Sequence, residues 1–206
     1  MLTVITPAVT TALTTLAAVK ADLAESGTAD DGWLEDAIRR ASATVCRFCN
    51  RVFALETVRE TIRLPVPTDA LTLARWPLVS IVSITEDGKP LAGTGYEAEG
   101  DAGAVYRLTG SDTRRPWPAG KIVVEYQAGY ALPGDPARTL PEDIERAVIL
   151  LVRHQWHARG CDPLVKAEEV DGVGRVEYWF GGGTKGSALP VEVDALLTSY
   201  RQPVMG

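Results

Sequence analysis

Two pairs of cysteine and histidine residues carry the side chains best suited to metal chemistry. Cys46 and Cys49 form Cys-Arg-Phe-Cys, His154 and His157 form His-Gln-Trp-His, and Cys161 follows the second pair. Thiolates and imidazoles are good zinc ligands, so their convergence would make a tetrahedral site. However, each pair lies inside a segment with helical periodicity, and the interval between the pairs is longer than in zinc fingers. The alternative is that both cysteines are small buried apolar residues, and that the histidines line a polar helix edge.

Other catalytic arrangements have less support in the sequence. Cys46-Arg-Phe-Cys49 closes a helix, whereas a redox-active pair opens one after a strand, where the helix dipole lowers the thiol pKa. No Gly-x-Ser-x-Gly is present, and the run Gly-Gly-Gly-Thr-Lys-Gly at 181–186 lacks the Lys-Ser or Lys-Thr order of a phosphate loop. A cluster of carboxylates is formed by Glu168, Glu169 and Asp171. We interpret them as solvated surface charges, because acid and base roles require an enclosing cleft. We therefore predict a protein that is not an enzyme and uses no cofactor and no metal.

Composition and charge favour a soluble intracellular protein. The chain has 206 residues, of which 46% are hydrophobic and 23% charged, close to the average of globular domains. A net charge of −6 argues against tight binding to nucleic acid, which depends on Lys and Arg neutralising phosphates. The N-terminus lacks the basic start of a signal peptide, and no apolar run approaches the roughly 18 residues that span a bilayer. Three cysteines fit a reducing cytosol.

The spacing of apolar residues predicts four helices. The first covers 13–23, and the second covers 33–49, with Leu34, Ala37, Ile38, Ala41, Val45 and Phe48 on one stripe. Thr139-Leu-Pro-Glu142 predicts a capping box that opens the third helix, in which the run 147–152 is apolar on nearly every side. We expect this helix to be the central element on which the first two helices and a sheet pack. A short last helix covers about 190–200.

Between the second and third helices, the spacing of apolar residues changes from the helical period to the alternation typical of strands. Residues 57–64 alternate as a half-buried strand, although Glu60 interrupts the pattern. Strands are also predicted at 71–73, 79–85, 104–108 and 121–126, and a hairpin over 169–178. The sequence thus predicts an α+β fold, with three to four helices packed with a small, mainly antiparallel sheet inserted at about 55–130. We expect a single domain over 1–186 and a C-terminal helix and tail arm over 187–206, tethered by the glycine run.

Aromatic and apolar residues in loops and in the tail form the candidate interface. Trp and Tyr are enriched at binding hot spots, so these side chains suggest surfaces that other polypeptides cover. Plain core packing is the competing interpretation for each of them. The candidate residues are Trp76, Trp117, Tyr178, Trp179, Phe180, Leu196, Leu197, Tyr200 and Arg201. The last four form the arm that we expect to dock on a partner or on an adjacent subunit.

Taken in order, several segments resemble the head-tail connector or adaptor proteins of tailed bacteriophages and gene transfer agents. The resemblance covers nearly the whole chain and depends on the order of its pieces, since none is diagnostic alone. The chain departs from the family at 154–161, so the resemblance implies no specific contact for that stretch. The segments are LAAVKADL at 16–23, the Asp pair at 30–31, CNRVF at 49–53, RWPLVSI at 75–81, YE at 96–97, WP at 117–118, EYQAGY at 125–130, LPEDIERAVILL at 140–151 and LPVEVDALLTSYR at 189–201.

The resemblance implies a structural subunit without enzymatic activity. It implies a ring of about twelve copies under the portal protein, with a tail-side connector or stopper protein below, and DNA passing through without specific binding. The acidic balance suits such a conduit. The implied location is the bacterial cytoplasm during assembly and then the neck of the particle, with no membrane involved. The alternatives are a tail-terminator or tail-completion protein and, with less support, a small zinc-binding module using Cys46, Cys49, His154 and His157.

Overall fold

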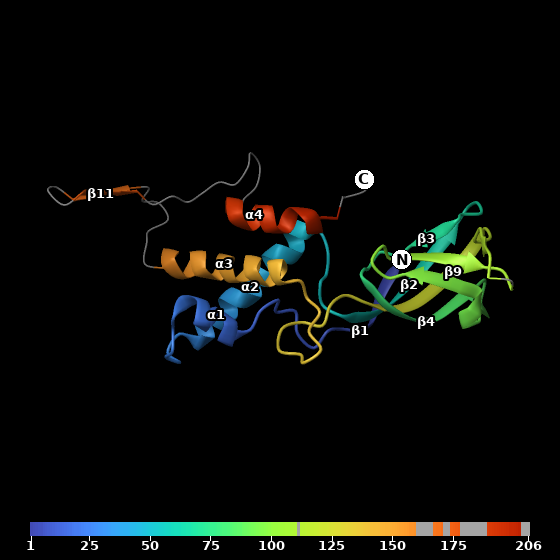
Figure 1. The fold of residues 1–206 in the computed structure, drawn as a ribbon, viewed down its shortest axis with the longest axis horizontal. Coiled ribbons are helices and arrows are strands. Elements are labelled where there is room, and N and C mark those ends of the chain that lie inside the picture. Colours follow the sequence, from blue (N-terminus) through green and yellow to red (C-terminus); the bar gives the residue numbers. More distant parts are fainter. Residues whose placement is uncertain (111, 160–166, 171–173, 178–188, 203–206) are drawn as a thin grey trace. The chain divides into compact units, whose positions relative to one another are not determined.

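The chain divides into two compact units, each built from two stretches of sequence. A computed structural model describes residues 1–110, 112–159, 167–170, 174–177 and 189–202 (Figure 1). The sheet unit comprises Met1–Thr10 and Val52–Leu132, and the helical unit comprises Thr11–Arg51 and Pro133–Gly206. In sequence, the strands from β2 to β9 lie between the second and third helices, whereas β1 precedes the first helix. This confirms the α+β fold class with an inserted antiparallel sheet.

The helical unit has four α-helices, packed through the apolar stripes that the sequence predicts. They are α1 (Leu16–Leu23), α2 (Asp31–Cys49), α3 (Glu142–Ala158) and α4 (Val191–Leu197), the last followed by the 3-10 turn η2 (Thr198–Tyr200). Helix α3 packs against each of the other three. Its residues 147, 148 and 150–152 are buried, as is the predicted stripe of α2 except for Phe48. The central place of the third helix among the helices is confirmed.

The helix ends show which local signals the chain uses. Thr15 caps α1 by accepting a hydrogen bond from the Ala18 amide at 3.2 Å, and Asn50 closes α2 in the left-handed conformation. The predicted capping box at the start of α3 is wrong. Pro141 occupies the N-cap position, so the helix begins at Glu142, which therefore cannot act as the third helical residue that the box requires. Carboxylates at Glu142, Asp143 and Glu145 instead complement the positive end of the helix dipole.

The sheet unit contains a five-stranded antiparallel sheet and a smaller one. The order of the first is β1 (Leu2–Thr6), β2 (Glu56–Leu64), β9 (Gly120–Ala128), β4 (Leu78–Glu86) and β5 (Lys89–Pro90). The second pairs β3 (Ala70–Thr72), β7 (Ala104–Leu108) and β6 (Tyr96–Glu99), and β8 (Arg114–Arg115) adds to β7; the 3-10 turn η1 covers Gly93–Gly95. The five predicted strands are present. Strand β1 is a further element that the sequence pattern does not reveal.

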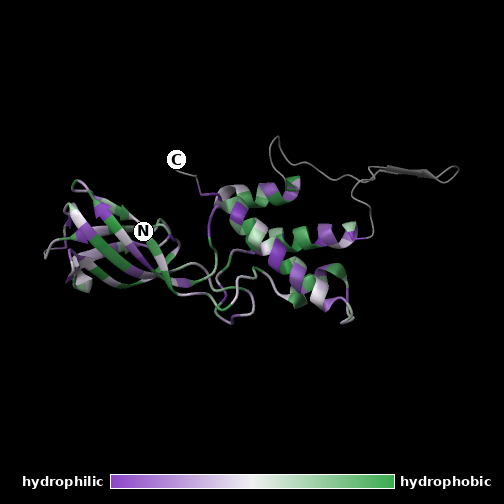
Figure 2. Ribbon diagram, turned by 180° about the vertical axis from the view of Figure 1, so that it is seen from behind, coloured by the Kyte–Doolittle hydropathy of each residue, from purple (hydrophilic) through white to green (hydrophobic). Residues whose placement is uncertain are grey.

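The sheet unit has a core of its own, made by strand and loop residues. Alternate residues of the central strand β9 point inward, and Figure 2 shows green and purple segments alternating along strands of this unit. The buried cluster consists of Val58, Leu71, Leu73, Leu78, Ile84, Val105, Trp117, Ile122, Val124, Tyr126 and Ala128. Inward-facing residues from both sheets pack on one another, so the sheet unit has an interior that does not depend on the helices.

The predicted hairpin after α3 is confirmed in the described backbone. Strand β10 (Ala167–Val170) pairs antiparallel with β11 (Gly174–Glu177). The glycine run at 181–186 lies outside the described residues. Among the helices that the structure describes, none has the length and apolar character needed to cross a membrane.

Candidate functional site

The C-terminal segment packs on the rest of the helical unit through one face of α4. Val193 and Leu197 are fully buried, and α4 lies along α3 (Figure 1). The side chain of Leu196 is half-buried, whereas that of Val191 is exposed. Helix α4 is therefore attached within its own unit, while the opposite side of the segment stays accessible.

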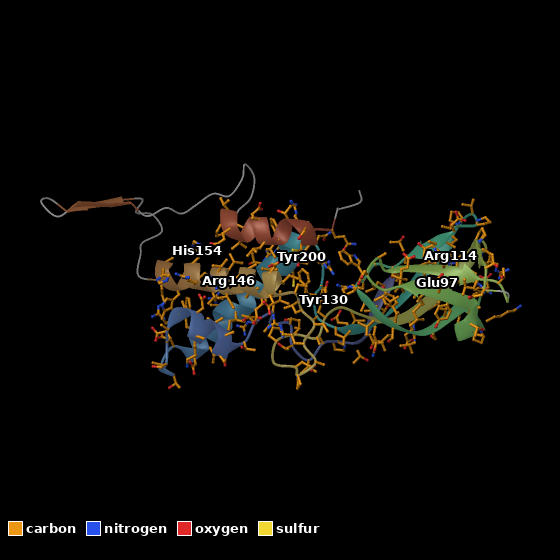
Figure 3. All side chains as sticks on the ribbon, in the orientation of Figure 1. Glu97, Arg114, Tyr130, Arg146, His154 and Tyr200 are labelled. Atoms are coloured by element: carbon orange, nitrogen blue, oxygen red, sulfur yellow. The ribbon has the colours of Figure 1, made fainter. Side chains whose placement is uncertain are left out.

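Residues after α4 continue this attachment at the end of α2. The Gln202 amide donates to the Cys49 carbonyl at 2.9 Å, and the Arg201 guanidinium lies over the Phe48 ring at 4.8 Å from its centroid. Tyr200, labelled in Figure 3, places its hydroxyl 3.5 Å from Asp143 on α3. The segment from α4 to Gln202 thus contacts both α2 and α3.

Cys49 lies beneath this C-terminal segment. Its Sγ is 4.0 Å from the Leu197 carbonyl, and its side chain is completely buried. Burial raises the pKa of the Cys49 thiol to about 11, although the Arg51 charge acts in the opposite direction. At neutral pH the thiol is therefore protonated, and it behaves as a small apolar residue.

The structure separates the six described residues of the nine predicted interface residues into three groups. Trp117 and Leu197 are buried, which is the core-packing alternative; the Trp117 Nε1 donates to the Val105 carbonyl at 2.9 Å. Trp76 is half-buried in the sheet unit, where it packs against the backbone of Gly103. Leu196, Tyr200 and Arg201 form one partly exposed segment of the helical unit. Tyr178, Trp179 and Phe180 lie outside the described residues.

A second aromatic cluster, at the start of α2 and the end of α3, is not predicted from the sequence. Trp33 and Trp156 meet edge to face, with ring centroids 5.5 Å apart. The Arg159 guanidinium lies 4.1 Å from the Trp156 ring centroid and pairs with Asp30 at 2.6 Å. Both tryptophans are half-buried. Helical periodicity places each ring on its own helix, but no local signal shows that helices about a hundred residues apart would bring them together.

A buried polar tie joins the chain before α1 to the start of α3. The Thr14 hydroxyl donates to Glu145 at 2.9 Å, and Arg138 pairs with the same carboxylate at 2.8 Å. Nearby, Arg146 pairs with Asp22 of α1 at 2.5 Å. These contacts give the Glu145 and Asp22 carboxylates charged partners where packing largely removes them from water.

In the sheet unit, Glu60 has a defined role despite interrupting the strand pattern. Its carboxylate accepts a hydrogen bond from the Tyr126 hydroxyl at 2.8 Å and from the Ala74 amide at 3.0 Å, while the Arg75 amide donates to the Tyr126 oxygen at 3.2 Å. Burial, with the adjacent Glu60 charge, raises the pKa of the Tyr126 phenol. This arrangement fixes the loop between β3 and β4 to the middle of the sheet.

An exposed charge cluster covers the outside of the smaller sheet. Arg114 pairs with Glu97 at 2.8 Å and with Glu99 at 3.3 Å, and its guanidinium lies 3.7 Å from the centroid of the Tyr106 ring. Glu97 and Arg114 are labelled in Figure 3. The hydrogen bond from Arg114 lowers the pKa of the Glu97 carboxyl. Arg114 therefore stabilises the ionised form of the Glu97 carboxyl on β6.

The zinc hypothesis finds no geometric support in the described part of the chain. Cys46 and Cys49 lie on α2, whereas His154 and His157 line a groove along α3 together with Arg146, Arg153 and Glu192. Among the described residues, no group of three or more histidine, cysteine, aspartate or glutamate side chains is placed to hold a metal ion. Cys161 lies outside these residues.

Two short motifs that carry the family resemblance acquire a physical explanation. Gly129 has φ +114°, and a Cβ there would lie 2.3 Å from the Ala54 carbonyl oxygen, so the backbone approach requires glycine. This approach brings Tyr130 onto Phe53 in a stacked pair, with centroids 6.4 Å apart. The sequences CNRVF and EYQAGY thus meet at one point of the sheet unit, where they fix the exit of β9 against the entry to β2.

Comparison with protein families and solved structures identifies the class. Residues 12–202 match the family model of the head completion protein. The chain therefore belongs to the head completion protein family, and its resemblance to phage head-tail connector proteins is confirmed. A search of the curated proteins finds no match.

Three solved structures share the fold over the full length of the chain. One is described as the neck of an empty gene transfer agent (GTA) particle with C6 symmetry, with a TM-score of 0.59 and 20% identity. The second is the virion of a native gene transfer agent particle, at 0.58 and 21%, and the third is the neck of a native GTA particle with C12 symmetry, at 0.56 and 20%. Each alignment covers 100% of this chain and 98% of the other.

Proposed function

We propose that this chain is a structural head-tail connector subunit, which forms a ring under the portal, joins the head to the tail and contributes to the DNA conduit. The observation that carries the proposal is the family match, which extends over both units, from residue 12 to residue 202. The full-length likeness to chains of GTA necks gives further support, because a shared fold over 98% of those chains makes the same kind of assembly accessible. This role depends on surfaces that bind other proteins and requires no catalysed reaction.

A closed ring requires two different surfaces on each subunit, because neighbours meet head to tail. In our proposal the ring takes the twelvefold symmetry of the GTA neck to which the fold is similar. The net charge of −6 suits a conduit through which DNA passes without adhesion to Lys and Arg. The portal and a tail-side stopper protein are the proposed partners.

The accessible side of the C-terminal segment is the proposed docking surface. Leu196 and Tyr200 are half-buried and Arg201 is exposed, while Val193 and Leu197 hold the segment on α3. A rigidly held apolar and aromatic surface loses little conformational entropy on binding. Trp76 is a second proposed contact, and Tyr178, Trp179 and Phe180 stay predicted contacts beyond the described residues.

Deletion of the gene tests the connector role directly. We expect DNA-filled heads and free tails that do not join, and restoration by the wild-type chain. Tailed, infectious or transfer-competent particles without the chain would contradict the proposal. Removal of 187–206 should also block joining, but this change removes buried Leu197 as well as the surface.

A single substitution tests docking without removing the buried residues of the segment. Arg201→Glu reverses one charge at the docking surface, and Arg39→Glu makes the same change on α2, where the Arg39 side chain is 72% exposed. If the segment docks, Arg201→Glu should lower the yield of joined particles by about tenfold, as expected for the loss of roughly 1.4 kcal/mol of binding free energy. Arg39→Glu should leave the yield unchanged. Equal yields for both variants would remove Arg201 from the proposed surface.

A further inference from the structure

Strands β2 and β9 carry two charged cross-strand pairs of different kinds on their outer face. Arg59 lies opposite Glu125, and the two side chains form an ion pair at 2.8 Å. Further along the same strands, Arg63 lies opposite Lys121, so two positive charges face each other. The Cβ atoms of such partners are about 5 Å apart, and like charges at these positions destabilise the pairing of strands. In the isolated chain, Arg63 and Lys121 therefore weaken the sheet that they belong to.

The sheet unit offsets this repulsion only in part. The Asp87 carboxylate accepts a hydrogen bond from the Lys121 amide at 2.8 Å, which is a contact with the backbone and not with the ammonium group. The side chains of Arg63 and Lys121 are both exposed, and neither forms an ion pair within the described residues. We refer to Arg63 and Lys121 as the basic pair.

Another like-charged pair in this unit has the counter-ion that the basic pair lacks. Arg107 on β7 lies opposite Arg115 on β8. The Glu86 carboxylate bonds to the Arg107 guanidinium at 2.7 Å, so only one of these two charges remains unpaired. The comparison indicates that the basic pair is completed by a carboxylate from outside its own unit.

The turn between α1 and α2 carries the opposite charge. Every charged residue from 25 to 36 is a carboxylate. Lys20 bonds to the Gly27 carbonyl at 2.6 Å and to Asp31 at 2.7 Å, which holds the turn against the start of α2. Glu25 and Glu35 are exposed and form no ion pair within the part of the chain that the structure describes. We refer to them as the acidic pair. The other carboxylates of this segment have partners in their own unit, in the ion pairs Asp30–Arg159, Asp31–Lys20 and Asp36–Arg39.

Glu25 also occupies an unfavourable position relative to a helix dipole. Its amide bonds to the Lys20 carbonyl at 2.9 Å, so the residue lies just beyond the last turn of α1, where the dipole is negative. Lys20 is the basic residue of that turn, but its charge is paired with Asp31. By contrast, the exposed Glu142 and Glu192 lie in the first turns of α3 and α4, where the dipole stabilises a carboxylate. Glu25 is therefore a negative charge that an external cation would stabilise.

We propose that the acidic pair of one copy binds the basic pair of the next copy in the ring, so that the helical unit of each subunit docks on the sheet unit of its neighbour. The inference rests on the proposed connector function, which supplies the neighbour. A second copy is the partner because this one chain carries both charge patches, which are complementary and lack ion pairs in their own units. The two patches are different surfaces, so their contact is heterologous, as a closed ring requires. Exclusion of water by the neighbour strengthens ion pairs that contribute little on an exposed surface.

Carbodiimide crosslinking of assembled particles tests the contact in the native chain. The reagent activates a carboxylate, and a lysine amine in contact with it displaces the activating group and forms an amide bond. We expect an amide between Lys121 and Glu25 or Glu35, identified by mass spectrometry in species of two or more copies. Extended reaction should produce a ladder of more than two copies. Lys121→Arg is the control, because it keeps the positive charge and the yield of joined particles but forms no such amide.

Charge reversal tests the same contact without weakening the fold. Arg63→Glu places a carboxylate opposite Lys121, and Glu25→Lys places a cation at the negative end of α1, so neither should lower the thermal midpoint of the purified chain. Each should nevertheless reduce the yield of joined particles by about tenfold or more. The double variant with both reversals should recover most of that yield. Arg115→Glu makes the matched change in the other like-charged pair and should leave the yield unchanged.

Each remaining outcome overturns the inference. An amide formed within a single copy shows that the two pairs meet inside one chain, and an adduct of Lys121 with another particle protein identifies a different partner. A reaction that stops at two copies indicates a two-fold dimer, and a lower thermal midpoint for Arg63→Glu assigns this arginine to the fold. Particles that contain the chain but give no such amide, or a double variant without recovery, reject the contact and leave the connector function intact. Failure of the wild-type chain to enter particles rejects both.

Discussion

The two units place their aromatic side chains differently. In the sheet unit Trp117 and Tyr126 are fully buried, and their polar atoms bond to Val105 and Glu60 within the unit. In the helical unit Trp33 and Trp156 are half-buried beneath the guanidinium of Arg159, close to the surface. Trp117 and Tyr126 therefore stabilise the interior of the sheet unit, whereas the two tryptophans of the helical unit lie near its surface. Loop position or aromatic type alone does not distinguish core from interface.

Replacing one buried and one surface tryptophan should separate the two roles most strongly. Trp117→Ala removes a fully buried ring and its hydrogen bond, so we expect it to lower the free energy of unfolding by about 3 to 5 kcal/mol. Trp156→Ala should cost only about 1 to 2 kcal/mol, because the ring is half-exposed and loses mainly its contacts with Trp33 and Arg159. Urea unfolding of both variants measures the difference. Equal costs would contradict the division between the units.

Within the helical unit, the buried and accessible sides of α4 should differ in the same way. Leu197→Ala should cost about 2 to 5 kcal/mol, whereas Leu196→Ala should cost about 1 kcal/mol. Alkylation of Cys49 reports the loosening of the segment, since its Sγ lies against the Leu197 carbonyl. We expect slow alkylation in the wild type at pH 8, where a thiol with a pKa of about 11 is protonated, and faster alkylation in Leu197→Ala.

The Cys49 thiol should also make stability depend on alkaline pH. Because its pKa is higher in the folded chain, the unfolded chain loses this proton first. The contribution is complete at neutral pH and declines as pH rises from the ordinary thiol pKa toward about 11. Cys49→Ala should flatten this part of the profile, which urea unfolding at a series of pH values measures. An unchanged profile in Cys49→Ala would show that the thiol does not titrate differently on folding.

In the sheet unit, a single hydroxyl should have a smaller but measurable effect. Tyr126→Phe keeps the ring but removes the partner of Glu60 and of the Arg75 amide, so we expect a cost of about 1 to 3 kcal/mol. Tyr106→Phe is the control, because the Tyr106 hydroxyl is exposed and lies 3.5 Å from Glu99. Similar costs for both variants would show that the buried tie contributes nothing specific.

The smallest expected effect concerns the exposed charges of β6. Arg114 lowers the pKa of Glu97 in the folded chain, so its stabilising contribution is present at neutral pH and is lost as pH falls through that lowered pKa. The thermal midpoint of Glu97→Gln should be slightly below that of the wild type at neutral pH, and the two should converge in acid. A difference that persists at low pH would mean that packing, and not charge, distinguishes them.

The helices could be predicted because their signal is local. The stripe of α2 and the apolar run of α3 are visible within single segments, and the burial of Leu34 or Val148 follows directly. The start of α3 was misassigned because Thr139-Leu-Pro-Glu142 matches a capping box in sequence, whereas Pro141 takes the cap position in the structure. Choosing between these alternatives needs the backbone angles.

The sheet unit depends more on partners distant in sequence. Strand β1 reads as a weakly apolar, threonine-rich segment and becomes a strand only by pairing with β2, more than fifty residues later. Glu60 looks like an interruption until Tyr126 supplies its partner, and Trp117 lies in a loop rich in glycine and proline until Thr68 pairs with it. The interface residues could not be predicted for the same reason. Trp117 and Leu197 are buried because residues distant in sequence pack around them.

Electron cryomicroscopy of the neck in particles assembled with the wild-type chain tests the central claim most directly. We predict density for this chain as a ring between the portal and the tail, with the C-terminal segment of each copy against a neighbouring polypeptide. Complete particles whose head and tail are joined without any density for this chain would contradict the account.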